Sequence, residues 1–155
     1  MRIAIILFLS IAAEGCVHHM ILPRSNFNGC GFVVVDDRPD PDYFYAKGGV
    51  VVQIRPTPSI ADSVKGAVCS AVNPQLLKES TFTITDFSCL ASGFFKMTYI
   101  VEMRGILTKG SDNPLEMGAG KKVDTIDGYV PAGCEKAASE VIPLLANKIQ
   151  ERLNQ

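Results

Sequence analysis

Alternating hydrophobic and polar positions predict five strands in the part of the chain that follows residue 30. The clearest pattern spans residues 95–107, where apolar side chains such as Phe95 and Met103 occupy one face and charged or hydroxyl side chains the other. Residues 81–87 alternate in the same way. This period of two is typical of an antiparallel strand with one face in the core and the other in water.

Three further strands are predicted from shorter signals. Residues 31–35 and 50–54 are rich in β-branched side chains, as buried strands are, and residues 122–130 form a weaker, more polar strand. The connecting segments 88–93 and 109–120 contain glycine, serine and other small polar residues, which predicts loops.

Two helices are predicted from apolar residues that recur at helical spacing. The first begins after Ser59, because Asp62 three residues later completes a pattern like a capping box, and it ends before Pro74. The second spans residues 134–153 and contains Pro143, which should kink the helix or remove one of its hydrogen bonds.

The order of these elements (two strands, a helix, three strands and a helix) predicts an α+β fold. We expect a mainly antiparallel sheet of about five strands, with both helices packed on one face. The chain has 155 residues and 47% of them are hydrophobic, which is enough for one core and too little for two comfortable domains. We therefore assign residues 30–155 to a single α+β domain.

The first fifteen residues are typical of a signal peptide. Arg2 is followed by the run 3–13, which is apolar apart from Ser10. A run of this length matches the hydrophobic region of an export signal and is too short to cross a bilayer as a helix. The alternative, a buried N-terminal strand or helix, accounts less well for a lone basic residue followed by apolar residues.

Cys16 follows this segment in a context that resembles the bacterial lipobox, in which small residues precede a cysteine that is acylated and becomes the new N-terminus. Gly15 fits this pattern and Glu14 departs from it. We expect residues 1–15 to be removed as a lipoprotein-type signal and Cys16 to anchor the chain, because several acyl chains hold a protein stably on a membrane. Val17, in place of aspartate, implies the periplasmic face of the outer membrane by resemblance to enteric sorting. The alternative is ordinary cleavage nearby, which would give a soluble periplasmic or secreted protein.

Residues 16–29 are predicted to form a tether between this anchor and the domain. They contain His18, His19 and Pro23 and show no sustained hydrophobic period. The absence of a period is typical of a solvated linker, and it favours such a linker over a metal site for the two adjacent histidines.

Four cysteines remain after Cys16, namely Cys30, Cys69, Cys89 and Cys134. An even number in an exported domain permits two disulfides, and we favour at least one over the alternative of four buried thiols. Spacing alone leaves all three pairings open. If consecutive strands alternate in direction, Cys30, Cys89 and Cys134 lie near one end of the sheet and Cys69 lies farther away. A bridge among the first three is then easier.

No pattern in the sequence identifies a catalytic or metal site. Both histidines fall in the predicted tether, so neither a nucleophile nor a mixed zinc site has a histidine inside the domain. The acidic segment 36–42 lacks the spacing of a calcium loop, and residues 118–122 lack the first glycine of a phosphate-binding loop. The formal net charge of −1 offers nucleic acid no attractive field. We predict no enzyme activity, no cofactor and no nucleic-acid partner.

Residues 33–39 (VVVDDRP) resemble the strand and Asp-x-Arg-Pro turn of the YajG-like bacterial outer-membrane lipoproteins. A glycine-rich stretch, an Ile-x-Pro element and a helix then follow in a similar order. We expect Asp36, Arg38 and Pro39 to form this family-like turn, with Arg38 paired to one of the neighbouring acids. The resemblance implies an envelope lipoprotein and supplies no catalytic residue.

The leading hypothesis is therefore a non-enzymatic envelope lipoprotein, an adaptor or assembly protein that acts by contact with an envelope protein of unknown identity. The polar face of the sheet and its last strand would form the contact surface, because an exposed strand edge accepts a partner strand. The alternative is a carrier of a lipid or small apolar ligand, auxiliary to an envelope transporter. A carrier requires a cavity between the helices and residues 95–107.

Overall fold

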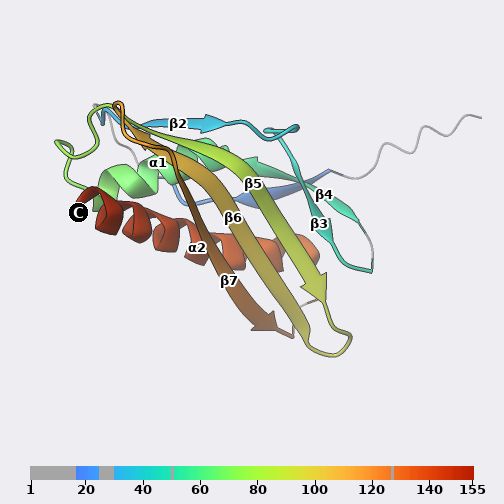
Figure 1. Ribbon diagram of the computed structural model, residues 1–155. Coiled ribbons are helices and arrows are strands. Elements are labelled where there is room, and N and C mark those ends of the chain that lie inside the picture. The colour runs from blue at the N-terminus through green and yellow to red at the C-terminus, as the bar shows by residue number, and fades with distance from the viewer. Residues whose placement is uncertain (1–16, 25–29, 50, 127) are drawn as a thin grey trace, which may run out of the picture.

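The computed structural model describes residues 17–24, 30–49, 51–126 and 128–155, which form one sheet and two helices (Figure 1). The strands are β1 (His18–Ile21), β2 (Val33–Asp36), β3 (Phe44–Lys47), β4 (Val52–Thr57), β5 (Ser80–Ser92), β6 (Met97–Lys109) and β7 (Leu115–Thr125). The helices are α1 (Ile60–Ala71) and α2 (Val130–Leu153). The α+β class is confirmed, but the sheet has seven strands instead of about five.

The sheet is mixed, so the prediction of a mainly antiparallel sheet is wrong. Its order is β1-β4-β3-β5-β6-β7, with β2 paired to β5 outside that order. The pairs β1–β4, β2–β5 and β3–β5 are parallel, and β3–β4, β5–β6 and β6–β7 are antiparallel. The sequence pattern missed β1 and β3, which have four residues each and are too short to show a period.

β2 and β3 lie one after the other along the same edge of β5. β2 pairs with the first residues of β5, from Thr81 to Ile84, and β3 pairs with Cys89 and Leu90 near its end. Between these two contacts, the register of β5 against β6 shifts between Ile84 and Asp86. Such an irregularity bends a strand and increases its twist, so it leaves room for the chain to cross from β2 to β3.

The segment predicted as a tether contributes a strand to the domain. β1 pairs with β4 at one edge of the sheet, and the side chains of Met20 and Leu22 are buried. Burial of each such side chain favours the folded state by about 1.5–3 kcal/mol. The tether prediction is therefore wrong for residues 18–22, where two apolar side chains tie the chain to the core.

Both helices lie on one face of the sheet, as predicted, and the core fills the space between the layers (Figure 1). β6 contributes Tyr99, Val101 and Met103, which are all fully buried. Phe95 was expected in the same row but lies in the β5–β6 turn, where 88% of its surface is exposed. The chain turns at Gly93, which adopts a φ of +118° that other residues rarely reach, and β6 therefore begins only after Phe95.

The boundaries of the later strands differ from the predictions. β5 continues to Ser92 through a predicted loop, and β7 begins at Leu115, inside another. The first segment contains two serines and the second two glycines, yet each pairs with β6 over its full length. Pairing with a long neighbouring strand therefore overrides local propensity here. β2 is also less buried than predicted, because Val33 and Val35 face solvent.

Both helices were located correctly from the sequence. The Ser59 hydroxyl accepts a hydrogen bond from the backbone N–H of Asp62 at 3.0 Å, as the capping pattern predicts. α2 begins at Val130, four residues earlier than expected, and continues through Pro143. In the described part of the chain, neither helix combines the length and the apolar character that crossing a membrane requires.

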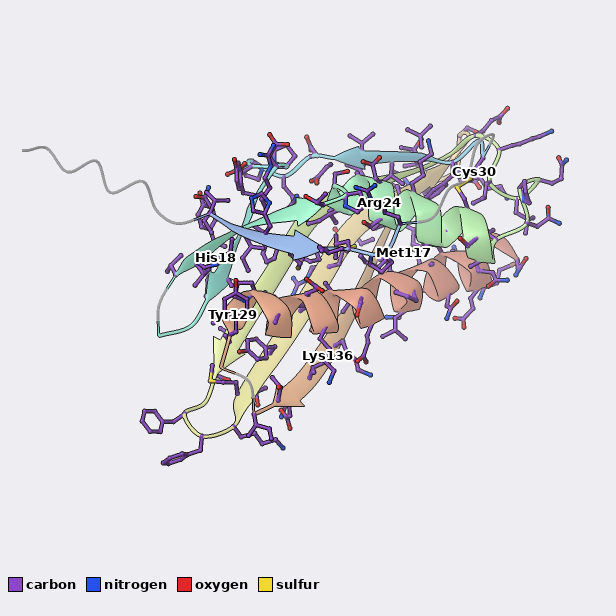
Figure 2. The ribbon with its side chains drawn as sticks, turned by 180° about the vertical axis from the view of Figure 1, so that it is seen from behind. His18, Arg24, Cys30, Met117, Tyr129 and Lys136 are labelled. Atoms are coloured by element: carbon purple, nitrogen blue, oxygen red, sulfur yellow. A yellow bond between two sulfur atoms is a disulfide. The ribbon has the colours of Figure 1, made fainter. Side chains whose placement is uncertain are left out.

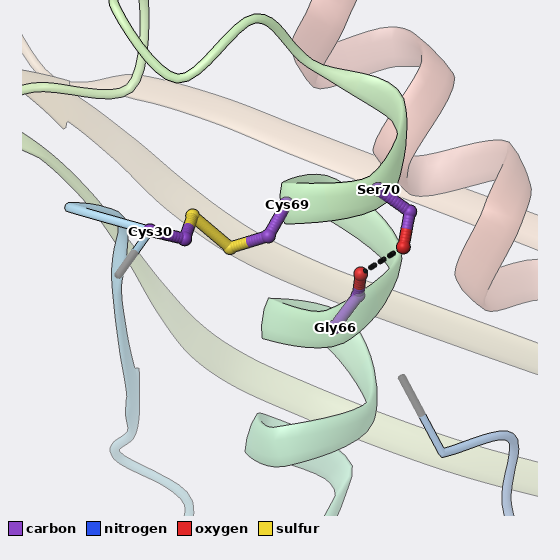
Figure 3. Close-up of a disulfide and its surroundings, with 4 residues drawn as sticks. All are labelled: Cys30, Gly66, Cys69 and Ser70. Atoms are coloured by element: carbon purple, nitrogen blue, oxygen red, sulfur yellow. Dashed lines mark hydrogen bonds between the residues drawn. A yellow bond between two sulfur atoms is a disulfide. The ribbon is translucent and has the colours of Figure 1, made fainter. Parts of the chain in front are cut away.

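Two disulfides fasten the helices to the strand layer. Cys30 is bonded to Cys69 of α1, as Figure 3 shows, and Cys89 of β5 is bonded to Cys134 of α2. The expectation that Cys69 lies far from Cys30 is wrong. β2 and β5 are parallel, so Cys30 before β2 and Cys89 near the end of β5 lie toward opposite ends of the sheet, and Cys30 is bonded to Cys69.

Removal of either disulfide should destabilise the domain. The bridges close loops of 39 and 45 residues, and loss of such a crosslink releases chain entropy in the unfolded state worth about 4 kcal/mol. We expect Cys89→Ala/Cys134→Ala to lower the free energy of unfolding by about 2–5 kcal/mol in denaturant titrations. Four thiols that react freely in the native protein would contradict the pairing.

Candidate functional site

The histidines do not lie in a solvated linker. Both belong to β1, and His18 Nδ1 is 3.1 Å from the hydroxyl of Tyr129, at the start of α2. His19 borders an open hollow of about 310 Å³, which is also lined by Asp42 and Arg55. Within the described residues, no cluster of three or more histidine, cysteine or acidic side chains could hold a metal ion.

The space between the helices and the sheet is filled with side chains. Tyr99 is completely buried under the first turn of α2, where a Cβ added to Gly133 would lie 2.2 Å from its ring. Leu145 and Met103 are equally inaccessible. The expected position of a ligand cavity is therefore occupied by core packing.

Asp36, Arg38 and Pro39 form a structured turn at the end of β2. Two nitrogen atoms of the Arg38 guanidinium each donate a 2.7 Å hydrogen bond to the Asp36 carboxylate. The side chains of Arg38 and Asp36 are only 5% and 8% exposed. The expected pairing of Arg38 with a neighbouring acid is confirmed, and the ion pair is buried and bidentate.

The Arg38 guanidinium also fixes the loop that joins β2 to β3. It donates hydrogen bonds to the backbone carbonyls of Pro41 at 2.9 Å and Tyr43 at 3.2 Å. Its carbon lies 5.9 Å from the centre of the Phe87 ring on β5. The family-like turn therefore positions the chain between the two segments that pair with β5, which is a structural task.

The other residues assigned from sequence lie elsewhere. Cys30 and Cys69 are at one end of the molecule, and Cys89 and Cys134 join β5 to the first turns of α2. Cys16, the proposed lipid anchor, lies outside the described residues and one position before Val17. The structure thus does not gather the assigned residues into one site.

One end of the sheet carries a group of exposed apolar side chains that sequence analysis did not identify. Three connections meet there: the β3–β4 turn, the β5–β6 turn and the segment from β7 to α2 (Figure 1). Their exposed apolar residues are Val51, Phe94, Phe95, Ile126 and Tyr129. We call this group the apolar end.

The strand registers place the three connections at the same end of the sheet. Met97 is opposite Thr125 in the antiparallel β6–β7 pair. Lys96, just before β6, and Ile126, just after β7, therefore lie at the same end of this pair. Gly48 of the β3–β4 turn lies against Ala91, where an added Cβ would be 2.7 Å from the Ala91 carbonyl oxygen. The rings of Phe94 and Phe95 contact each other edge to face, with centroids 5.0 Å apart.

The charged groups nearest the two phenylalanines are paired with each other. Lys96 Nζ lies 3.0 Å from the Asp124 carboxylate, and Thr98 donates a 2.7 Å hydrogen bond to the same group. The Thr98 hydrogen bond, reinforced by Lys96, holds the pKa of Asp124 below its usual value. The carboxylate and ammonium charges therefore largely cancel near the two phenylalanines. Asp127, in the same connection, lies outside the described residues.

Both outer edges of the sheet are approached by side chains of α2. Glu135 accepts a hydrogen bond from the backbone N–H of Ile21 in β1, at 3.0 Å. Lys148 donates one to the carbonyl oxygen of Gly118 in β7, at 2.7 Å. The helix thus engages one backbone group at each outer edge, which a partner strand would otherwise be able to use.

Comparison with known proteins supports the fold and assigns no activity. No family model and no curated protein sequence matches the chain. A solved structure of an uncharacterized protein matches with a TM-score of 0.51 and 11% identity, covering 88% of this chain and 99% of that one. At this identity the similarity shows a shared fold alone.

Two further solved structures resemble the chain more weakly. A Xanthomonas campestris protein of the DUF330 family matches with a TM-score of 0.47 and 10% identity, over 88% of this chain and 95% of that one. A Caulobacter crescentus protein described as a candidate lipoprotein matches with a TM-score of 0.38 and 10% identity, over 80% of this chain and 88% of that one.

Truncation of Arg38 should destabilise the domain strongly. Arg38→Ala leaves the Asp36 carboxylate buried without its partner and releases the Pro41 and Tyr43 carbonyls. Breaking a buried ion pair in this way costs about 3–5 kcal/mol. We expect a loss of that size in the free energy of unfolding, measured by denaturant titration.

Arg104→Ala is the matched control for this experiment. Arg104 forms a 3.0 Å ion pair with Glu102, but both side chains are exposed on the outer face of the sheet. Loss of an exposed pair costs about 0–1 kcal/mol. Equal destabilisation by the two variants would show that the Asp36–Arg38 pair does not organise the β2–β3 loop.

Proposed function

We propose that this chain is a non-enzymatic lipoprotein of the bacterial envelope, held by acylated Cys16 on the periplasmic face of the outer membrane. The observation that carries this proposal is the pair of disulfides that join each helix to the strand layer. Structural disulfides form and persist in oxidising compartments, which include the periplasm. They agree with export through the segment 1–15.

The start of the fold supports the position of the anchor. Met20 is buried only four residues after Cys16, so the chain is in the core almost immediately. The two residues from Cys16 to His18 reach at most about 7 Å when extended. Acylation of Cys16 would therefore keep the domain close to the membrane surface.

Membership of the YajG-like lipoproteins is a finer proposal. Its support is that the residues carrying the resemblance, Asp36 and Arg38, form the buried pair that sets the β2–β3 loop. A short motif with such a structural task can persist in a fold while the rest of the sequence changes.

We propose further that the protein acts by contact with another envelope protein. The outer face of β5, β6 and β7 faces away from both helices (Figure 1). It combines the half-buried Ile100 and Ile106 with the Glu102–Arg104 ion pair. A shallow hollow of about 580 Å³ lies on this face beside Arg104 and Glu116. Mixed apolar and charged surfaces of this kind suit a protein partner.

The carrier alternative finds less support. It needs an enclosed apolar space, but the hollows beside Leu107 and beside Arg104 are open at the surface, and Tyr99 fills the region under α2. Binding sites for apolar ligands usually enclose most of the ligand. A protein contact is therefore the better-supported function.

Intact mass spectrometry of the protein extracted from bacterial membranes tests the anchor. We expect a chain that begins at Cys16 and carries the added mass of its acyl groups. A Cys16→Ser variant should lose that mass and leave the membrane fraction. An unmodified chain with another N-terminus would make the protein soluble in the periplasm or secreted, and would refute the lipoprotein proposal.

A photoreactive residue placed at Ile106 tests the contact surface in cells. We expect illumination to yield one reproducible adduct with an envelope protein, because Ile106 lies on the open sheet face. Lys136, on the exposed side of α2, is the control position and should give no such adduct. Adducts at neither position, or the same adducts at both, would count against the outer face.

A further inference from the structure

We propose that the apolar end inserts into the surface of the lipid bilayer and orients the domain on the membrane. This inference deepens the proposed function, because it assigns a membrane-facing surface to the anchored protein. It rests on the exposure of the apolar end and on the direction in which the chain enters the fold.

The exposure of the apolar end is unusual for a water-soluble surface. Phe94 and Phe95 are each 88% exposed and Ile126 is 90% exposed, while Val51 in the neighbouring turn is 65% exposed. Single exposed apolar residues are common, but large apolar side chains from three separate connections at one end mark an interaction surface.

The direction of β1 brings the anchor to the same end. β5 runs toward the β5–β6 turn, and β3 is parallel to it. β4 is antiparallel to β3 and β1 is parallel to β4, so β1 runs away from that turn. The chain before His18 therefore joins the domain from the side of the apolar end. Figure 2 shows His18 beside Tyr129 on this side of the molecule.

The side chains fit the chemistry of a bilayer surface. Phenylalanine and isoleucine gain by leaving water, and tyrosine is enriched where apolar chains meet head groups. Tyr129 is half exposed and bonded to His18, so it lies at the rim of the group. Lys47 is exposed beside the β3–β4 turn and can reach anionic head groups.

The bilayer is a better occupant than a second protein copy. An acyl chain on Cys16 would hold the membrane within about 7 Å of β1, as the reach of two residues requires. The anchor then keeps the apolar end close to the lipid surface, so the effective concentration of lipid around it is very high. Burial of apolar side chains in the interface would add to the attachment that the acyl groups provide.

Tryptophan fluorescence can test this contact, since the chain contains no tryptophan. Phe95→Trp reports on the apolar end. Val33→Trp is the control, because Val33 is also exposed but lies at the opposite end of the sheet, opposite Thr81 of β5. The acylated proteins are reconstituted in vesicles of phosphatidylethanolamine and phosphatidylglycerol, with or without bromine on the acyl chains.

We expect the brominated lipid to quench Phe95→Trp by roughly half or more, because inserted side chains reach about 5–10 Å into the interface. Val33→Trp should remain unquenched. If the protein floats with the vesicles and neither tryptophan is quenched, the anchor stands and the insertion is refuted. A blue shift of Phe95→Trp that needs high protein concentration and no lipid would instead assign the apolar end to self-association.

A second measurement keeps the inference testable if Cys16 proves unmodified. The chain as isolated is floated with the same vesicles, and Phe94→Ser/Phe95→Ser should lower its binding about tenfold or more. Val33→Ser/Val35→Ser removes exposed apolar side chains elsewhere and should leave binding unchanged. No vesicle binding by the parent chain, or equal loss in both variants, would overturn insertion.

Discussion

The long antiparallel pairing of β5 with β6 is the interaction on which the rest of the structure depends. It creates the continuous apolar face that α1 and α2 cover, and every other strand joins it directly or through intervening strands. The shift in register after Ile84 then divides the free edge of β5 between β2 and β3. At the other end of the β5–β6 hairpin, the turn between the two strands exposes Phe94 and Phe95 to solvent.

The Asp36–Arg38 pair solves a problem that this division creates. A chain that leaves β5 and returns a few residues later exposes carbonyl groups to a partly buried environment, where each needs a hydrogen-bond donor. Arg38 supplies donors to Pro41 and Tyr43 while the Asp36 carboxylate balances its charge. A pair of apolar residues could fill the same volume at equal or lower cost, but it could not fix the loop carbonyls. The pair therefore contributes by holding the loop in one conformation.

The sequence predicted those elements whose signal is local and long. The Ser59 cap and the helical spacing located α1, and alternation located most of β6. β1 and β3 could not be found, because four residues show no period and their stability comes from partners distant in sequence. The start of β7 was missed because its glycines indicate a loop until β6 is placed beside them. Cys30 was placed at the wrong end of the sheet, beside Cys89, although the parallel strands β2 and β5 separate the two residues.

The candidate site was harder to predict than the fold, for a related reason. Cys16 and the 33–39 segment are recognisable as local patterns, whereas the apolar end is assembled from three connections. Phe95 even continues the alternation of β6, so the pattern assigned it to the core. Only the turn at Gly93 separates it from the buried row and turns it outward. A surface of this kind becomes visible once the strand registers show that Val51, Phe94 and Ile126 share one end of the sheet.

The Cys89–Cys134 disulfide restrains the part of the fold that carries the apolar end. Cys89 lies three residues before the end of β5, and its bond to Cys134 ties the base of the β5–β6 turn to the first turns of α2. The connection from β7 enters α2 at the same place. The disulfide therefore links the strand and the helix from which two of the three connections of the apolar end extend. A surface braced in this way loses little conformational freedom when it meets a partner, so more of its apolar contact remains available for binding.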